Sequence, residues 1–326
     1  MRTSATLAAH RVHDLRRGPL ADQQAPQRVI VEIGVLAPPG HDELKDVRRL
    51  GVAPAHDEAG GGKCARLGGV GAAEVAVHAA HGPGALVALT CHLVEQGHRV
   101  VLVVATGGEL GLDHPEVDHL GAHRRAEADS AARTLGVDAL HFLGHRDSGM
   151  PGDPANDAPG SFWSADVGEA APALADVLRD EEVDALAVYD RTGIYGHPDH
   201  VQAHRVGVAA ARLAGITAVH EMTVDREYLH FVETHLVEEA ALAGAALTGD
   251  LGLARSRIGS ASVEIHLALD VRGWLPTKRA AMAAHASQLP EHSPVFGLDD
   301  ERFGEVYGWE WFIRRGEPGP IDELAR

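Results

Sequence analysis

Two histidines three residues apart, His197 and His200, are the side chains whose type and spacing most clearly suggest chemistry. They flank Pro198 and Asp199 in the stretch Tyr195-Gly-His-Pro-Asp-His200. A neutral imidazole is a good zinc ligand, and proline stiffens the backbone that aims the two rings. The stretch therefore predicts a metal or acid–base site. Taken in isolation, such a stretch is more often a polar turn in which Asp199 caps a helix, and the motifs elsewhere in the chain are what favour a functional site.

Other polar side chains follow predicted strands along the chain. Glu109 follows the apolar run 99–105, Asp147 follows the run 139–143, and the histidine pair follows the run 185–189. The carboxyl ends of parallel strands meet at one edge of a sheet, and ligands and catalytic groups collect there. We therefore expect these imidazoles and carboxylates to converge, as a mononuclear metal hydrolase requires.

Strand and helix patterns alternate through most of the chain, without an internal repeat. The run Arg99-Val-Val-Leu-Val-Val-Ala105 is typical of a strand buried on both faces of a sheet. The alternation predicts an α/β fold with a mostly parallel sheet and helices on both faces. The expected strands are 28–36, 74–78, 99–105, 139–143, 185–189, 217–222 and 263–271, and the expected helices are 86–96, 123–135, 166–179, 201–213, 225–246 and 276–288.

The composition excludes several classes of function. A formal net charge of -18 over 326 residues argues against nucleic acid and anionic membranes as partners. Two cysteines without a CxxC pair exclude a cysteine-rich zinc site and fit a reducing compartment. No apolar run approaches a membrane span, and the arginine-containing start lacks the apolar core of a secretory signal. We expect a cytoplasmic protein.

Changes in pattern along the chain suggest its organisation. We expect a disordered tail over 1–27, an atypical segment over 28–72, the main domain over 73–316 and a short tail over 317–326. Within the main domain, a long loop contains the stretch from Met150 to Gly160. Loops of this length usually serve as lids or binding loops. This loop is therefore a candidate lid or subunit contact, and the chain is a candidate homo-oligomer.

Several further motifs, in order and spacing, give the chain a family resemblance. They are Gly97–Glu109, Arg124-x-x-Glu127, Arg146-Asp-Ser-Gly-Met150, Asn156–Trp163, the Tyr195–His200 stretch, Lys278–Met282, His285-Ala-Ser-Gln288 and Trp311–Gly316. From about Glu74 to Gly316 the chain resembles the PIG-L/LmbE-type zinc-dependent N-deacetylases. That family includes enzymes of mycothiol metabolism that act on N-acetylglucosaminyl-inositol or on mycothiol conjugates.

The resemblance implies a Rossmann-like fold and one zinc ion per chain, held by two histidines and one aspartate. In this sequence His200 matches one of the ligands. His197 matches the residue that stabilises the oxyanion or protonates the leaving amine, and Tyr195 and Asp199 belong to the same catalytic motif. The matching substrate contacts are Glu109, Arg124 and Asp147. Each has a structural alternative, such as an Arg124–Glu127 helix pair or a turn capped by Asp147.

The first motif of the family, His-Pro-Asp-Asp-Glu, is not intact in this chain. One alignment places it at His78-Ala-Ala-His-Gly82, where Ala80 replaces the general base and His81 replaces the aspartate ligand. Zinc accepts three imidazoles, so His78, His81 and His200 are one candidate ligand set. The missing carboxylate matters more, because a general base typically accelerates a reaction by about 10²–10⁴-fold.

Two alternatives to this alignment stay open. The motif also aligns with His56-Asp-Glu-Ala-Gly-Gly-Gly62, with Asp57 as base or ligand and a long insertion before Leu93. The second alternative is a compensated shift of the reading frame, which would account for the unfamiliar sequence before about Cys91. The nucleotide sequence would decide whether such a shift occurred.

The resemblance favours a zinc-dependent hydrolase that removes an acetyl group from an N-acetylglucosamine-type glycoconjugate or a related small amide. The alternative is a relative that binds metal or sugar without turnover, because its first motif is altered. A nucleotide-binding Rossmann protein is disfavoured, since Gly82-Pro-Gly84 lacks the third glycine of the phosphate-binding loop.

Overall fold

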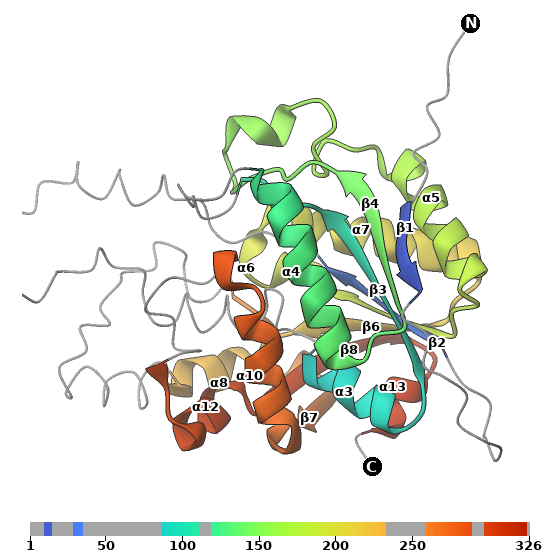
Figure 1. The fold of residues 1–326 in the computed structure, drawn as a ribbon. Helices are drawn as coiled ribbons and strands as arrows, with labels where there is room; N and C mark the ends of the chain where they lie inside the picture. Colours follow the sequence, from blue (N-terminus) through green and yellow to red (C-terminus); the bar gives the residue numbers. More distant parts are fainter. Residues whose placement is uncertain are drawn as a thin grey trace, which may run out of the picture.

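An eight-stranded sheet forms the centre of the protein (Figure 1). The computed structural model describes residues 10–14, 29–34, 87–110, 119–232, 258–288 and 297–324. The strand order is β1-β4-β3-β2-β5-β6-β8-β7. The strands are β1 (His10–Asp14), β2 (Val29–Gly34), β3 (Arg99–Thr106), β4 (Ala139–His145), β5 (Ala185–Tyr189), β6 (Ala218–Thr223), β7 (Leu267–Asp270) and β8 (Trp309–Gly316).

Five consecutive strands of the sheet, β4, β3, β2, β5 and β6, run parallel. The antiparallel pairs are β1 with β4 on one side, and β8 with β6 and with β7 on the other. The predicted α/β fold with a mostly parallel sheet is thereby confirmed. β2 lies between β3 and β5, with Val31 opposite both Val101 and Leu186. Because β3 and β5 lie on opposite sides of β2, the chain reverses its direction of winding there.

Two layers of helices cover the sheet (Figure 1). Helices α5 and α7 pack together on one face, and α10 packs against α3 and α4 on the other. The helices are α3 (Val87–Glu95), α4 (Leu120–Leu135), α5 (Val167–Asp180), α6 (Gly193–Gly196), α7 (Pro198–Ala214), α8 (Arg226–Phe231), α10 (Leu275–Ala283), α12 (Asp300–Tyr307) and α13 (Pro320–Glu323), and short 3-10 turns are η2 (Pro154–Asp157), η5 (Ser262–Glu264), η6 (Arg272–Trp274) and η7 (Ala286–Gln288).

The apolar runs of the sequence became the inner strands because both faces of the sheet are covered. All five residues of β5 are buried, and its bounds are those predicted. Two helices, α4 and α7, end at a glycine in the left-handed region, which is a common way for a helix to end. These glycines are Gly136, with φ 74°, and Gly215, with φ 80°. The core is built mainly of Ala, Val and Leu.

Some predicted elements differ in the structure. The helix predicted over 276–288 is divided into α10 and η7, because the chain turns to bring Ser287 against α4. Of the strand predicted over 263–271, only β7 is formed, and η5 precedes it. The helix predicted over 225–246 is described only as α8, since residues 233–257 lie outside the described part, as does the strand predicted over 74–78.

Two segments that the sequence suggested as tails contain regular structure. Residues His10–Asp14 pair as β1 with β4. After residue 316, α13 buries Ile321, and the Asp322 carboxylate accepts hydrogen bonds at 2.9 Å from both His220 and Arg314. The apolar side chain and the buried carboxylate contacts explain why this segment packs on the sheet rather than extending from it.

A buried ion pair anchors the start of α3. The Glu310 carboxylate of β8 accepts hydrogen bonds from the backbone N–H groups of Ala88 (3.2 Å) and Leu89 (2.9 Å), and it pairs with Lys278 Nζ at 2.9 Å. Glu310 thus satisfies N–H groups that a helix start leaves unpaired. Nearby, burial raises the pKa of the Cys91 thiol to about 12, so it stays protonated.

None of the described helices is both long and apolar enough to cross a bilayer.

Replacing Glu310 should destabilise the fold strongly. Glu310→Ala leaves the Lys278 ammonium buried without its carboxylate and supplies no new partner, so we expect the free energy of unfolding to fall by about 3–5 kcal/mol. Urea titration of the purified variants measures this loss. Asp270→Ala, which removes a surface partner of Arg272, is the control and should change stability only slightly. Equal losses in the two variants would contradict the assigned role.

Candidate active site

The side chains singled out by the sequence gather at the carboxyl ends of β3, β4 and β5. The loop after β3 carries Glu109, the segment after β4 carries Asp147, and the turn after β5 leads to His197 and His200. β2 and β5, between which the winding direction changes, are neighbours in the sheet. This is the edge where open α/β sheets place their ligands.

A strained turn connects β5 to α7. Gly193 has φ +65°, and a Cβ there would lie 2.8 Å from His200 Cβ and 2.9 Å from the Val201 nitrogen. Any other residue at this position would therefore push α7 away. The next residue, Ile194, has φ 66° and ψ −59° although it is β-branched. Such a conformation costs about 1–3 kcal/mol and persists only where the surroundings impose it.

The ring of His200 is fixed from two sides. It is fully buried and stacks on the Tyr189 ring, with centroids 4.0 Å apart and planes inclined by 5°. Its Nδ1 lies 3.3 Å from the Gly193 carbonyl oxygen. Because a carbonyl can only accept, Nδ1 of His200 carries a proton. A histidine that binds metal through Nε2 is commonly held in this way.

His197 has the opposite arrangement. Its ring caps α7, because Nδ1 accepts a hydrogen bond from the backbone N–H of Asp199 at 3.2 Å. The proton of the neutral ring is therefore on Nε2, which is buried and has no partner among the described residues. Burial lowers the pKa of His197 to about 3, so the ring is neutral at pH 7. His197 thus presents a neutral N–H donor, which suits a developing oxyanion.

The Asp199 carboxylate is turned toward the loop after β4. It accepts hydrogen bonds from the Ser148 backbone N–H, at 3.1 Å, and from the Ser148 hydroxyl. The same hydroxyl accepts from the Trp163 N–H at 2.8 Å. Burial, reinforced by the charge of Asp147, raises the pKa of Asp199 to about 8. In this arrangement Asp199 ties α7 to the 146–164 loop.

Asp147 and Glu109 hold two loops together. Asp147 accepts from the backbone N–H groups of Gly149 (2.9 Å) and Leu110 (3.2 Å), and burial raises the pKa of its carboxyl. Glu109 in turn accepts from the Asp147 N–H at 3.0 Å. Glycine at 107 and 121 leaves room for the Glu109 side chain, since a Cβ at Gly107 would lie 2.5 Å from its Oε1.

Arg124 is fully buried and its guanidinium contacts protein groups. It donates to the Gly108 carbonyl, and to the hydroxyl and carbonyl oxygens of Ser287, both at 3.3 Å. Glu127 accepts from the Ser287 N–H at 2.8 Å and from its hydroxyl at 2.6 Å. Burial lowers the pKa of Arg124 to about 10. Arg124 therefore joins α4, the loop after β3 and η7.

His285 and Gln288 belong to a motif that the sequence singled out without assigning roles. His285 is buried, with Nδ1 3.0 Å from Gln288 Nε2, and burial lowers its pKa to about 3 with a smaller contribution from the Arg124 charge. Ser287, which lies between these two residues in the sequence, contacts Arg124. Their common motif with Ser287 was the sequence signal of this packing.

Comparison with known proteins identifies the family. The family model "PIG-L: GlcNAc-PI de-N-acetylase" matches residues 85–211. A 1D-myo-inositol 2-acetamido-2-deoxy-alpha-D-glucopyranoside deacetylase from Acidothermus cellulolyticus is 36% identical over 241 residues, covering 69% of this chain and 82% of the relative. The chain belongs to the PIG-L family. A deacetylase of the same name from Streptomyces griseus is 38% identical over 253 residues, covering 69% of this chain and 77% of the relative.

Among solved structures, N,N'-diacetylchitobiose deacetylase from Pyrococcus horikoshii aligns with 91% of this chain and 88% of its own, with 16% identity and a TM-score of 0.48. The stretch matched by the PIG-L model contains all seven described candidates: Glu109, Arg124, Asp147, Tyr195, His197, Asp199 and His200. This family member is therefore an enzyme of the de-N-acetylase type.

The remaining predicted residues of this PIG-L family member cannot be placed. His56, Asp57, His78 and His81 lie outside the described residues. Within the described ranges, no group of three or more His, Cys, Asp or Glu side chains is arranged to hold a metal. The position between β3 and β5 is filled by β2, and residues 35–86, which follow β2, lie outside the described part of the chain. The individual roles of the site residues stay predictions.

The buried His285 should make stability depend on pH. Its pKa is 6.5 in the unfolded chain and about 3 in the folded one, so below pH 6.5 only the unfolded state takes up the proton. Stability is therefore complete above pH 6.5 and falls toward pH 3. Between pH 7 and 5 the wild type should lose about 2 kcal/mol more than His285→Gln. Chemical denaturation at several pH values measures both slopes, and parallel curves would contradict the prediction.

Proposed function

We propose that this PIG-L family member is a zinc-dependent hydrolase that removes the acetyl group from an N-acetylglucosamine-type glycoconjugate. The observation that carries the proposal is the geometry of the buried pair: the neutral ring of His197 has its proton on Nε2, and Nδ1 of His200 faces the Gly193 carbonyl oxygen. The names of the relatives at 36% and 38% identity support the substrate class, because both act on a 2-acetamido-2-deoxy-glucopyranoside of inositol.

Zinc fits the described residues in one respect. His200 directs the N–H of its Nδ1 to the Gly193 carbonyl, an arrangement that is common among histidines that bind metal through Nε2. The other ligands would come from outside the described residues, either His78 and His81 or the segment with His56 and Asp57. When bound, zinc would polarise the acyl carbonyl and lower the pKa of a water molecule toward neutrality.

His197 would act through its Nε2–H. As the amide carbon becomes tetrahedral, negative charge grows on the former carbonyl oxygen, and a buried N–H donor stabilises that charge. Its low pKa argues that the neutral ring donates a hydrogen bond, rather than an imidazolium donating a proton. Tyr195 packs edge-on against both rings, with centroids 5.1 Å from His200 and 6.1 Å from His197, so it would approach the same carbonyl.

The described carboxylates differ in their suitability as substrate contacts. Asp147 is buried and bonded to backbone N–H groups, and Asp199 is bonded to Ser148. Glu109 is the exposed member of the group, so it is the best placed to accept a hydrogen bond from a sugar hydroxyl. A general base for the attacking water would come from the segments outside the described residues.

Replacing either histidine of the pair should abolish most of the activity. We expect His197→Gln to lower kcat by about 10²–10³-fold, as does the loss of an oxyanion donor. His200→Ala should lose both turnover and bound zinc. The measurement is free amine released from N-acetylglucosaminyl-inositol, together with elemental analysis. His266→Gln, on the chain entering β7, is the control and should retain both.

The alternative function is binding without turnover, which the altered first motif favours. It predicts zinc or sugar binding by the wild type with no amine released above the His200→Ala background. Elemental analysis also separates the alignments of the first motif. Loss of zinc in the His78→Ala, His81→Ala double variant but not in His56→Ala, Asp57→Ala supports the first, and the reverse supports the second.

A further inference from the structure

We propose that Asp190 is a positioning residue for this active site: its carboxylate holds the turn between β5 and α7 in the strained conformation that orients His200. The proposal rests on the proposed function for its catalytic consequence. Asp190 immediately follows β5 and is buried, with 1% of its surface exposed. None of the motifs singled out from the sequence assigned it a role in the reaction.

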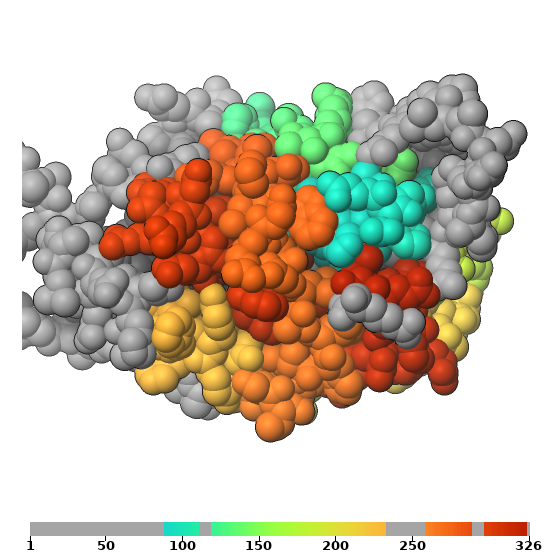
Figure 2. All heavy atoms as spheres, turned by 90° about the horizontal axis from the view of Figure 1, so that it is seen from below, coloured from blue at the N-terminus to red at the C-terminus, as the bar shows by residue number. Residues whose placement is uncertain are grey.

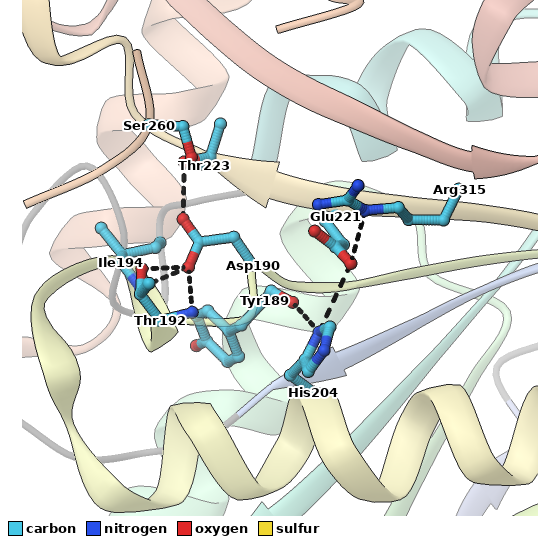
Figure 3. A network of polar contacts seen from close by, with 9 residues as sticks. All are labelled: Tyr189, Asp190, Thr192, Ile194, His204, Glu221, Thr223, Ser260 and Arg315. Carbon is cyan, nitrogen blue, oxygen red and sulfur yellow. Dashed lines mark hydrogen bonds and ion pairs between the residues drawn. The ribbon is translucent and has the colours of Figure 1, made fainter. Parts of the chain in front are cut away.

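The Asp190 carboxylate is the centre of a polar network (Figure 3). Oδ1 accepts hydrogen bonds from the backbone N–H of Thr192 (2.9 Å), the Thr192 hydroxyl (2.7 Å) and the backbone N–H of Ile194 (3.0 Å). Oδ2 accepts from the Thr223 hydroxyl at 2.6 Å. Since that hydroxyl has one proton, it accepts in turn from the Ser260 hydroxyl at 3.0 Å. Through these hydrogen bonds the carboxylate links the turn to β6 directly and to the segment after residue 257 by way of Thr223.

Ile194 is held at both of its peptide groups. Its N–H donates to Asp190, and its carbonyl accepts from the Gly259 N–H at 2.7 Å. Gly259 is itself in the left-handed region, with φ +62°, and packs against the Val224 carbonyl. A β-branched residue has no intrinsic preference for φ 66°. These two hydrogen bonds therefore supply the restraint that keeps the turn in its observed shape.

The restrained turn also fixes the histidine pair, because Gly193 and Tyr195 of the turn contact the two rings. Gly193 lies between Thr192 and Ile194, its N–H donates to the Asp190 carbonyl at 2.9 Å, and its own carbonyl oxygen is the partner of His200 Nδ1. Tyr195, which contacts both imidazoles, is the next residue after Ile194. If the turn relaxed, the Gly193 carbonyl would move and His200 would lose one of the two contacts that fix its ring.

The other side of the strand end is held independently. The Tyr189 carbonyl is 3.1 Å from His204 Nδ1, and His204 lies 3.7 Å from Glu221, which pairs with Arg315 at 3.0 Å (Figure 3). This second group keeps Tyr189 and its stacked ring in place when Asp190 is changed. A variant of Asp190 therefore tests the turn rather than the whole strand end.

The experiment compares three variants by steady-state kinetics on N-acetylglucosaminyl-inositol. Asp190→Ala should lower kcat by about 100-fold with KM changed by less than about threefold, because a displacement near 1 Å costs that much in rate while substrate contacts remain. Asp190→Asn keeps an oxygen for Thr192 and Ile194 and should stay within about tenfold of wild type. Asp322→Ala removes a comparably bonded carboxylate that does not touch the turn, and should keep the wild-type kcat.

Equal losses of kcat in Asp190→Ala and Asp322→Ala, or no rescue by Asp190→Asn, would overturn the proposal. An activity-independent readout separates it from the proposed function. Amide exchange at Ile194 and the Nδ1–H signal of His200 in ¹⁵N-labelled protein should both change in Asp190→Ala and not in Asp322→Ala. If the wild type does not deacetylate the substrate, the proposed function fails, and these two signals still decide whether Asp190 positions the ring.

Discussion

The short turn between β5 and α7 is the constraint on which the arrangement of the site depends. α7 begins at Pro198, directly after His197, so the chain must leave the strand and enter the helix within a few residues. It does so by placing Gly193 and Ile194 in the left-handed region. The Gly193 carbonyl and the first N–H groups of α7 then dictate which nitrogen of each imidazole carries its proton. The chemistry of the pair follows from backbone geometry.

Burial gives the site its electrostatic character. Burial lowers the pKa of His197 and raises that of Asp199, so it favours the neutral form of both groups. Arg124 is buried among backbone and side-chain acceptors, behind the loop after β3. Figure 2 shows the face seen from below, where α3, α8, α10, α12 and the C-terminal segment lie at the surface. His197, Asp199 and Arg124 are fully buried. Polar residues of the site stabilise its loops through their hydrogen bonds.

The sequence predicted the inner strands well because their pattern is physical: a sheet covered on both faces needs uninterrupted apolar runs, as in β3 and β5. It also placed His197 and His200 at a strand end. It did not reveal that the ring of His197, rather than the Asp199 carboxylate, caps α7, or that Arg124 binds Ser287 more than 160 residues away in sequence. The Arg124 contact depends on tertiary packing, which a local pattern does not contain. The cap by His197 is local, but histidine is not among the residue types that usually cap a helix. Likewise, the residue types of Asp190 and Ile194 do not predict a strained turn.

The ring protonation of the two histidines is the most direct test of this account. In ¹⁵N-histidine-labelled protein at pH 7, assigned with His197→Gln and His200→Gln, both rings should be neutral and of opposite tautomers. His197 should carry its proton on Nε2 and His200 on Nδ1. The same tautomer in both rings, or a charged His197, would contradict the claim that the turn and the helix start determine the chemistry of the pair.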